Sequence, residues 1–178
     1  MITIKITFLL FSMLANMDAQ VIYDFTAQSD NDWYVVDDVV MGGRSNGDVL
    51  ISSEGHAVFS GVVSLENNGG FSSIRYRSPI ISTKGYSAFK LRIKGDGKNY
   101  QFRVRSSLSE RQAYIYEFET TGEWQDIEIP FHKMHPGFRG VKLDLPNYPG
   151  EKMQECSFLI SNKKNESFRL EIDKIRME

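Results

Sequence analysis

The sequence contains a single cysteine, three histidines and no large excess of either charge among its 178 residues. The lone Cys156 cannot form an internal disulfide, and it cannot build a cysteine-based metal site by itself. It lies in the apolar run from Cys156 to Ile160, so we expect it to be a buried small hydrophobe. The 21 basic and 23 acidic side chains give a formal net charge of −2, without the bias typical of proteins that bind nucleic acid or anionic membranes. Nucleic acid is therefore not an expected partner.

Common catalytic and cofactor-binding patterns are also missing. No Gly-x-Ser-x-Gly nucleophile motif occurs. Gly95-Asp96-Gly97 lacks the third glycine of a nucleotide loop, and it lies between two predicted strands with no helix to receive a phosphate. His132 and His135 have the spacing of two metal ligands, but no third ligand joins them in the sequence, which favours solvated loop histidines. We expect no cofactor, no metal and no catalytic residue, and hence a protein that is not an enzyme.

What the sequence does contain is enough apolar material for one packed domain. Hydrophobic residues make up 41% of the chain and aromatic residues 12%. The apolar residues recur with a period of two in nearly every segment, and no amphipathic helix of ten or more residues is evident. Many short strands between Gly, Asn and Pro turns predict a β-sandwich or barrel. The expected strands lie at 21–25, 33–36, 57–65, 71–75, 86–94, 99–106, 113–120, 124–131, 156–161 and 168–176, and 132–154 is expected to be one long loop.

Residues 1–19 differ from the rest of the chain. Lys5 precedes a mostly apolar run at 6–15, and a short polar stretch follows before Gln20. This order is typical of a secretory signal peptide, and the apolar run is too short to span a bilayer as a stable helix. We therefore predict a signal at 1–19, a single domain at 20–178, no stable membrane span after signal removal, and export to the periplasm or cell envelope if the protein is bacterial. The alternatives are a mitochondrial transit segment, which would place the protein in mitochondria, and a first strand or helix of the domain.

One predicted hairpin can be argued to the level of its register. Apolar and polar residues alternate in 89–94 and in 99–105, and Asp96-Gly97 lies between these segments. An Asp-Gly pair favours a tight turn with positive φ. With that turn, Leu91 faces Phe102 and the flanking apolar residues pair in the same way, so that all of them share one face.

The other face of this predicted hairpin is basic, and it includes Arg92 and Arg103. The segment 113–120 is expected to lie beside 99–105, which places Phe118 beside Phe102 and Glu117 beside Arg103. A solvated, charge-balanced sheet face is the favoured interpretation, because exposed ion pairs contribute little to stability. A weak electrostatic docking surface is the alternative.

Two segments combine paired glycines with side chains that form hydrogen bonds. The first, 36–45, contains Gly42-Gly43, and the second, 59–75, contains Gly69-Gly70. Paired glycines indicate a backbone that needs positive φ or very close approach. Such turns either hold the fold or carry a site, because loops on a rigid sheet scaffold are common places for recognition.

These segments resemble the signatures of a known family. The run 38–45, Asp-Val-Val-Met-Gly-Gly-Arg-Ser, is similar to the opening signature of the complex I intermediate-associated protein 30 domain. The runs 59–75 and 94–100 resemble its second and third signatures, and Trp124, 129–131 and 168–172 match in order and spacing. The resemblance covers about 21–177 and implies an all-β, antiparallel jelly-roll sandwich of the galactose-binding-like type. It also implies a non-catalytic role, typified by mitochondrial members that assist assembly of respiratory complex I.

We therefore expect a protein-binding module, assembly-factor or chaperone-like, whose partner is another protein such as a respiratory-complex subunit. A carbohydrate-binding module of the cell envelope is the alternative that the sandwich class allows, with Trp33, Tyr76 and Tyr148 as candidate aromatics for stacking on sugar. The two Gly-Gly turns are expected to meet at one edge of the sandwich and to form the binding surface. The candidate binding residues are Asp38, Met41, Gly42, Gly43, Arg44, Ser45, Asn67, Asn68, Gly69, Gly70 and Arg75.

Overall fold

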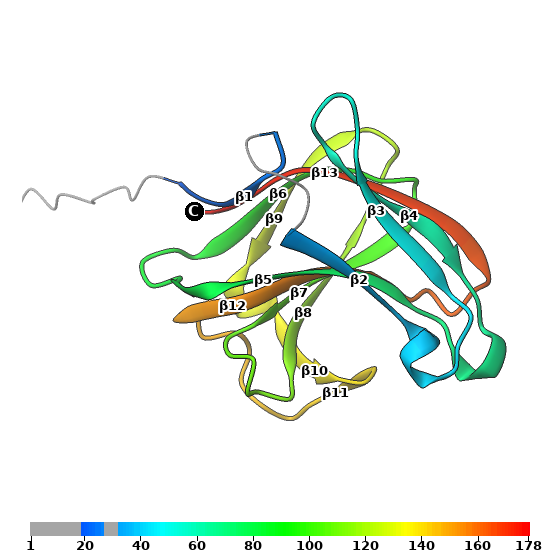
Figure 1. Cartoon of the computed structure of the whole chain (residues 1–178). Coiled ribbons are helices and arrows are strands. Elements are labelled where there is room, and N and C mark those ends of the chain that lie inside the picture. Colours follow the sequence, from blue (N-terminus) through cyan, green and yellow to red (C-terminus); the bar gives the residue numbers. More distant parts are fainter. Residues whose placement is uncertain (1–18, 27–31) are drawn as a thin grey trace, which may run out of the picture.

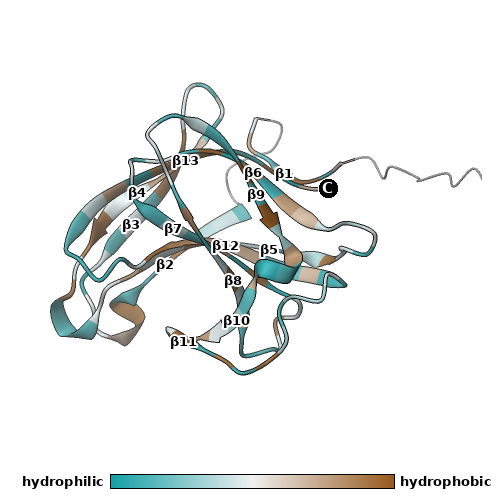
Figure 2. Ribbon diagram, turned by 180° about the vertical axis from the view of Figure 1, so that it is seen from behind, coloured by the Kyte–Doolittle hydropathy of each residue, from teal (hydrophilic) through white to brown (hydrophobic). Residues whose placement is uncertain are grey.

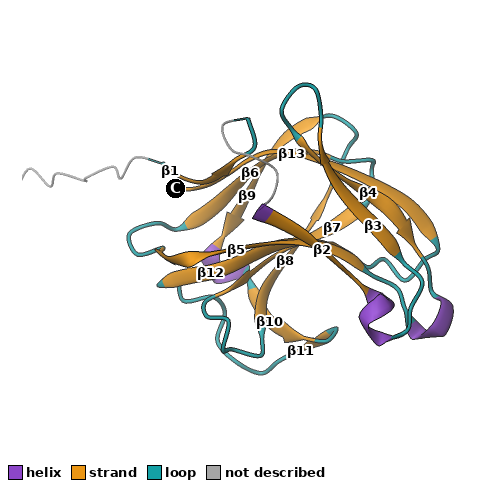
Figure 3. Ribbon diagram, viewed as in Figure 1, coloured by secondary structure: helices purple, strands orange, loops and turns teal. Residues whose placement is uncertain are grey.

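Two antiparallel sheets face each other in the computed structural model, which describes residues 19–26 and 32–178 (Figures 1 and 3). The six-stranded sheet has β3, β4, β13, β6 and β9 as neighbours in that order, and β1 also pairs with β13. Its strands are β1 (Gln20–Asp24), β3 (Asn46–Ile51), β4 (Ala57–Val63), β6 (Ala88–Lys94), β9 (Trp124–Pro130) and β13 (Glu166–Met177). The predicted all-β sandwich is confirmed, whereas the predicted signal at 1–19 falls almost wholly outside the described residues.

The seven-stranded sheet has the order β11, β10, β8, β7, β12, β5, β2. Its strands are β2 (Trp33–Asp37), β5 (Ser72–Ser82), β7 (Asn99–Arg105), β8 (Ala113–Glu119), β10 (His135–Phe138), β11 (Val141–Lys142) and β12 (Lys152–Ile160). Short 3-10 turns occur at η2 (Asp38–Met41), η3 (Glu66–Asn68) and η4 (Phe131–Lys133). In Figure 1, β10 and β11 lie below the rest of this sheet, on the side away from the six-stranded sheet. Because β12 lies between β5 and β7, residues far apart in sequence come together on its outer face.

The core lies between the sheets and is built from apolar residues of both. Figure 2 shows hydrophobic residues, in brown, on strands of both sheets. Phe89 from β6 and Phe102 from β7 meet across the sandwich, with ring centroids 5.4 Å apart. Trp33, Phe158 and Tyr23 pack into the same core. Cys156 is buried there as expected, and burial raises the pKa of its thiol well above the ordinary value.

The predicted hairpin is wrong in one respect. Asp96-Gly97 does form a turn, and Gly97 has a φ of 82°. However, β6 pairs with β13 and β9, whereas β7 pairs with β12 and β8, so this turn passes from one sheet to the other. Leu91 and Phe102 therefore lie on facing sheets and are not lateral neighbours. Period-two alternation shows which side of each strand is buried. It does not show whether two consecutive strands pair within one sheet or face each other across the core, because both arrangements give the same sequence pattern.

Because β6 and β7 belong to different sheets, the predicted basic face is not one surface. Arg92 lies on the outer side of the six-stranded sheet, and Arg103 lies on the outer side of the seven-stranded sheet. The predicted pairing of β7 with β8 is confirmed, but its register differs by two residues. Phe118 is opposite Tyr100 and Glu117 is opposite Gln101, so neither lies beside its predicted partner.

Three strands were not expected from the sequence. The segment 132–154, predicted as a loop, contains β10 and β11, and β10 continues the seven-stranded sheet beyond β8. Pro136 in β10 hid this strand, because proline is confined to positions near sheet edges. The edge strand β3 alternates only between exposed and half-buried residues, so its sequence carries no strong apolar pattern.

Candidate functional site

The two Gly-Gly segments meet, as predicted, at one end of the sandwich. The 3-10 turns η2 and η3 lie beside each other in Figure 1, where β2 and β4 end. The Asn67 side-chain amide donates a hydrogen bond to the Gly42 carbonyl oxygen at 3.1 Å, which joins the two turns directly. We call this pair of turns the Gly-Gly loops.

A buried carboxylate, that of Asp38, organises the Gly-Gly loops. Asp38 is 0% exposed. Its Oδ1 accepts the Ser45 backbone N–H at 2.9 Å. Its Oδ2 accepts the Ser45 hydroxyl at 2.5 Å and the backbone N–H groups of Gly70 and Phe71 at 2.6 and 3.2 Å. One side chain thus satisfies donors from both loops, and a buried charge is tolerated because its acceptor sites are filled.

These hydrogen bonds also set the acidity of Asp38. Burial by itself would raise the pKa of the carboxyl group, but the Ser45 hydroxyl and the amides of Gly70, Ser45 and Phe71 together hold it below the ordinary value. Asp38 is therefore ionised at neutral pH, and it acts as the negative centre around which the loops fold.

The paired glycines are explained by their closeness to this carboxylate. A Cβ atom on Gly43 would lie 2.3 Å from Asp38 Oδ1, and one on Gly69 would lie 2.5 Å from Asp38 Oδ2. Both separations are far shorter than van der Waals contact, so no other residue fits without moving the buried carboxylate. Asp38, Gly43, Ser45, Gly69 and Gly70 thus form an inner layer whose contacts are internal to the domain.

An outer layer of the same loops faces solvent. Val39, Val40 and Met41 follow Asp38 in η2, and they are 60%, 74% and 60% exposed. We call these three residues the loop tip. Arg44 and Glu66 form an exposed ion pair at 3.1 Å beside it. The remaining predicted residues Gly42, Asn67 and Asn68 are also exposed.

Other predicted binding residues lie elsewhere. Arg75 is on β5, opposite Tyr34 of β2 and Ser157 of β12, and its guanidinium extends toward Glu155 and not toward the Gly-Gly loops. The three aromatics considered for sugar stacking do not form an exposed platform. Trp33 and Tyr148 are buried, and Tyr76 packs against the core beside Trp33.

The described residues contain no group of three or more side chains placed to hold a metal ion. His132 is exposed and His135 is half-buried on β10. Across 19–26 and 32–178, no helix is long and apolar enough to cross a membrane.

A comparison with models of known families identifies the family of this chain. The model of the family described as complex I intermediate-associated protein 30 matches residues 23–172. The chain belongs to the complex I intermediate-associated protein 30 family. A comparison with curated proteins finds no match. The resemblance carried by the Gly-Gly segments is therefore confirmed over most of the chain.

Solved structures show the same fold in other proteins. A family 11 carbohydrate-binding module from Clostridium thermocellum, in complex with a mixed-linked β-1,3-1,4 tetrasaccharide, is 17% identical, with a TM-score of 0.63 over 89% of this chain and 94% of that one. An agarase is 10% identical, with a TM-score of 0.59 over 90% of this chain and 24% of that one. A variant of a family 29 carbohydrate-binding module is 13% identical, with a TM-score of 0.51 over 91% and 92%. At these identities the likeness shows a shared jelly-roll fold.

This complex I intermediate-associated protein 30 domain has a second polar surface, which was not predicted from the sequence. On the outer face of the seven-stranded sheet, β12 runs between two strands that each carry a pair of arginines, and we call these four residues the arginine array. The array consists of Arg75 and Arg77 on β5 and Arg103 and Arg105 on β7. Strand pairing sets Arg77, Glu155 and Arg105 in one row across the three strands. The next row is Arg75, Ser157 and Arg103.

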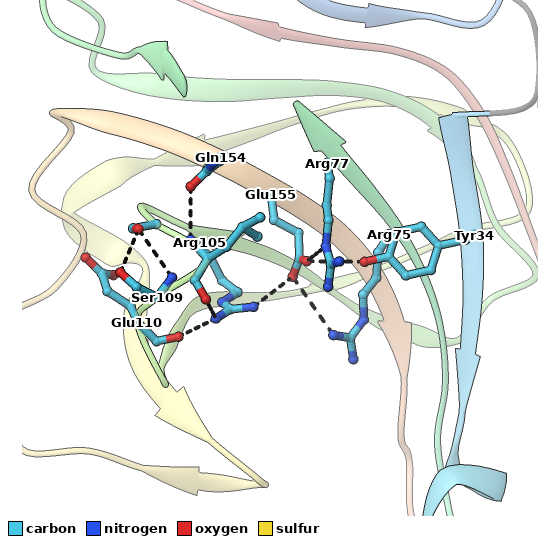
Figure 4. A network of polar contacts seen from close by, with 10 residues as sticks. Tyr34, Arg75, Arg77, Arg105, Ser109, Glu110, Gln154 and Glu155 are labelled. Atoms are coloured by element: carbon cyan, nitrogen blue, oxygen red, sulfur yellow. Dashed lines mark hydrogen bonds and ion pairs between the residues drawn. The ribbon is translucent and has the colours of Figure 1, made fainter. Parts of the chain in front are cut away.

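Glu155 is the charged centre of the first row (Figure 4). It is 3% exposed, and its Oε2 accepts a hydrogen bond from Arg77 Nε at 2.9 Å. Its Oε1 lies 3.7 Å from Arg105 Nη1 and 3.9 Å from Arg75 Nη1. The Glu155 carboxylate raises the pKa of Arg77, chiefly through that hydrogen bond. One buried carboxylate is thus shared among three guanidinium groups.

Arg103 is bound differently. Its Nε and Nη2 donate to the Gln101 side-chain oxygen at 2.9 and 2.5 Å, and the Gln101 amide in turn donates to Glu117 at 2.7 Å. Among the described residues, no carboxylate lies within ion-pair distance of its guanidinium. Burial, followed by the charge of Arg75, lowers the pKa of Arg103 to about 10, against a smaller opposing effect of Glu117. Arg103 therefore remains protonated at neutral pH, as a half-buried cation.

The sheet is hollowed next to the array. A hollow of about 120 Å³ is lined by residues of β7, β8, β10, β11 and the turn between the last two, including Arg103, Glu117, His135 and Lys142. Burial and the charges of Lys142 and Arg103 lower the pKa of His135, while Glu117 opposes them. The sequence could not reveal this surface, because it depends on β12 lying between two strands that are 50 or more residues earlier in the chain.

Proposed function

We propose that this chain is a non-catalytic protein-binding domain of the assembly-factor type, and that it contacts its partner through the loop tip, Val39, Val40 and Met41. The observation that carries this proposal is the exposure of three consecutive aliphatic side chains on a turn whose base is fixed by a buried carboxylate. Exposed apolar side chains on a rigid base favour protein contact, because burying them releases water without a large cost in ordering.

Family membership supports a protein partner. The family is described by its association with an intermediate of complex I, so subunits of a respiratory complex are the first partners to test. The proposal does not require catalysis. The Ser45 hydroxyl donates to the Asp38 carboxylate in the Gly-Gly loops, but the two residues are 1% and 0% exposed, so this pair is closed to a substrate. Asp38 is fully engaged by hydrogen bonds from the loops themselves and has no free role as a base.

Carbohydrate binding is the second candidate, and the fold shared with carbohydrate-binding modules is what favours it. The side chains argue against it as the main function. Among the described residues, every large hydrophobic side chain that is exposed is aliphatic. Tyr34 reaches the outer face of the seven-stranded sheet, but the Arg77 guanidinium stands over its ring at 5.2 Å from the centroid. A sugar would have to displace Arg77 to stack there.

Site-specific photo-cross-linking in the native host tests the loop tip. A photoreactive residue at position 40 is expected to capture a specific protein that mass spectrometry identifies, and a respiratory-complex subunit would support the assembly role. The matched control is position 80, because Ile80 is 59% exposed and lies toward the other end of β5 from the Gly-Gly loops. Val40→Asp should abolish co-purification of the captured protein without lowering the thermal midpoint, since Val40 is 74% exposed.

Two outcomes of these experiments would contradict the proposed contact surface. Identical products from positions 40 and 80, or unchanged co-purification with Val40→Asp, would show that the loop tip is not the contact surface. Retention on immobilised mixed-linked β-glucan, weakened by Tyr34→Ala but not by Val40→Asp, would favour the carbohydrate candidate.

A further inference from the structure

The rows of the arginine array differ in what stands at their centres. In the row Arg77, Glu155, Arg105, the central side chain is a carboxylate in contact with guanidinium groups on both sides. In the row Arg75, Ser157, Arg103, the central side chain is a hydroxyl group. Glu155 and Ser157 are two residues apart on one strand, so both side chains point to the same face about 6.6–6.8 Å from each other.

The first row has a carboxylate between its two arginines, and the second row does not. Glu155 demonstrates that a carboxylate fits between arginines on β5 and β7. Over Ser157, the corresponding position has Arg75 on one side and Arg103 on the other, and the domain supplies no anion there from its described residues. Arg75 reaches Glu155 only at 3.9 Å, and Arg103 is held by the neutral Gln101 amide oxygen. The four arginines of the array thus share Glu155 as their only carboxylate within ion-pair distance among the described residues, and Glu117 reaches Arg103 only through the Gln101 amide.

This imbalance is local. The whole chain has a formal net charge of −2, so the array is a confined positive surface on a slightly acidic protein. Nucleic acids and other long polyanions favour more extended basic surfaces than this one. A guanidinium group is planar and matches a carboxylate with two parallel hydrogen bonds, which gives two arginines on either side of Ser157 selectivity for that group.

We propose that the second row of the arginine array binds a carboxylate of an acidic, extended protein segment, with that carboxylate over Ser157 between Arg75 and Arg103. In an extended segment alternate side chains point the same way, at about the spacing of alternate residues along β12, so every second residue of the segment can present a carboxylate to the array. Tyr34 lies opposite Arg75 at the edge of the array, but the Arg77 guanidinium covers its ring at 5.2 Å from the centroid, which favours a peptide over an acidic polysaccharide that would stack there. This surface is distinct from the loop tip, and the proposal holds or fails independently of the protein-binding role proposed there.

Fluorescence anisotropy with a labelled peptide of alternating glutamate and serine tests this site. The full domain should bind the peptide, with affinity that falls as salt rises, and should not bind the same peptide with glutamine in place of glutamate. Arg103→Gln should weaken binding about tenfold, as expected for loss of charge-assisted hydrogen bonds. Arg92→Gln is the matched control, because Arg92 lies on the outer face of the other sheet and already pairs with Asp126 at 3.1 Å.

A second variant fills the site from within. Ser157→Glu places a carboxylate where the ligand's carboxylate is proposed to lie, by the example of Glu155 two residues earlier. It should abolish peptide binding and leave the thermal midpoint at or above that of the parent. Equal losses with Arg103→Gln and Arg92→Gln, or undiminished binding by Ser157→Glu, would overturn the proposal. Binding of oligogalacturonate but not of the glutamate peptide would also overturn it, in favour of an acidic polysaccharide.

Discussion

The Gly-Gly loops and the arginine array are both polar clusters built around a buried carboxylate, but they are satisfied to different degrees. In the loops, Asp38 fills its acceptor sites with hydrogen bonds from Ser45, Gly70 and Phe71. In the array, Glu155 serves three arginines, and Arg103 has no carboxylate within ion-pair distance among the described residues. The first cluster is complete by itself, and the second has cationic groups left for a partner.

This difference separates the inner layer of the Gly-Gly loops, whose contacts are internal to the domain, from an array that has cationic groups without a carboxylate partner among the described residues. The signature residues Asp38, Gly43 and Gly69 are required by one another, because the glycines make room for the carboxylate. The contacts of these three residues are therefore with one another and with the rest of the domain. The arginines of the array form no contiguous motif, and they become a surface only when β5, β12 and β7 pair.

The largest expected effect is on the completed cluster. Asp38→Ala leaves buried N–H groups of two loops without an acceptor, so it should lower the free energy of unfolding by about 3–5 kcal/mol. Gly43→Ala should also destabilise strongly, because its Cβ would lie 2.3 Å from Asp38 Oδ1. Urea denaturation of both single variants and of the double variant measures the coupling between them.

In the double variant the carboxylate that Gly43 avoids is gone. The cost of Gly43→Ala should therefore be much smaller in the Asp38→Ala background than in the parent. Additive costs would mean that Gly43 is required for its backbone conformation alone, and that the loops are not organised around Asp38.

A smaller effect is expected at the incomplete cluster. Glu155→Gln removes the negative charge shared by Arg75, Arg77 and Arg105, and should lower the free energy of unfolding by about 1–3 kcal/mol because these arginines remain partly open to solvent. It should at the same time strengthen binding of the glutamate peptide, since both rows then lack a carboxylate. Denaturation and anisotropy on the same preparation check both effects, and weaker peptide binding by a folded variant would contradict an electrostatic array.

Much of the fold could be predicted from the sequence, and the reasons for the failures are physical. Alternation identified the buried faces of β6 and β7 and the turn at Gly97, because burial is imposed residue by residue. It could not assign these strands to different sheets, since Phe89 and Phe102 are buried whether they lie side by side or face each other. The strands β3 and β10 were missed because an edge strand and a proline-containing strand carry weak patterns.

The candidate site divides in the same way. The meeting of the Gly-Gly loops was predictable, because glycine pairs flanked by Asp and Asn indicate a turn with internal acceptors. The role of Arg75 was not, since its neighbours Ser157 and Glu155 are about 80 residues away in sequence and reach it only through strand pairing. Local chemistry can be read from a motif, whereas a surface made by lateral pairing requires the sheet order.

The smallest predicted effect concerns His135, which reports the charge of the array without belonging to it. His135 on β10 shares its hollow with Lys142 of β11, Glu117 of β8 and Arg103 of β7. Burial and the two cations lower the pKa of His135, and Glu117 opposes them. Arg103→Gln removes one cation, so the pKa of His135 should rise, and binding of the glutamate peptide to the parent should raise it as well.

NMR titration of the imidazole protons measures both changes, with His135→Gln used to assign the resonance among the three histidines. Arg92→Gln, on the opposite face of the sandwich, should leave the pKa unchanged. If Arg103→Gln also leaves the pKa of His135 unchanged, solvent screens the charge of Arg103 within the hollow. The positive potential of the array, which the Asp38 cluster of the Gly-Gly loops lacks, would then not extend beyond the arginines themselves.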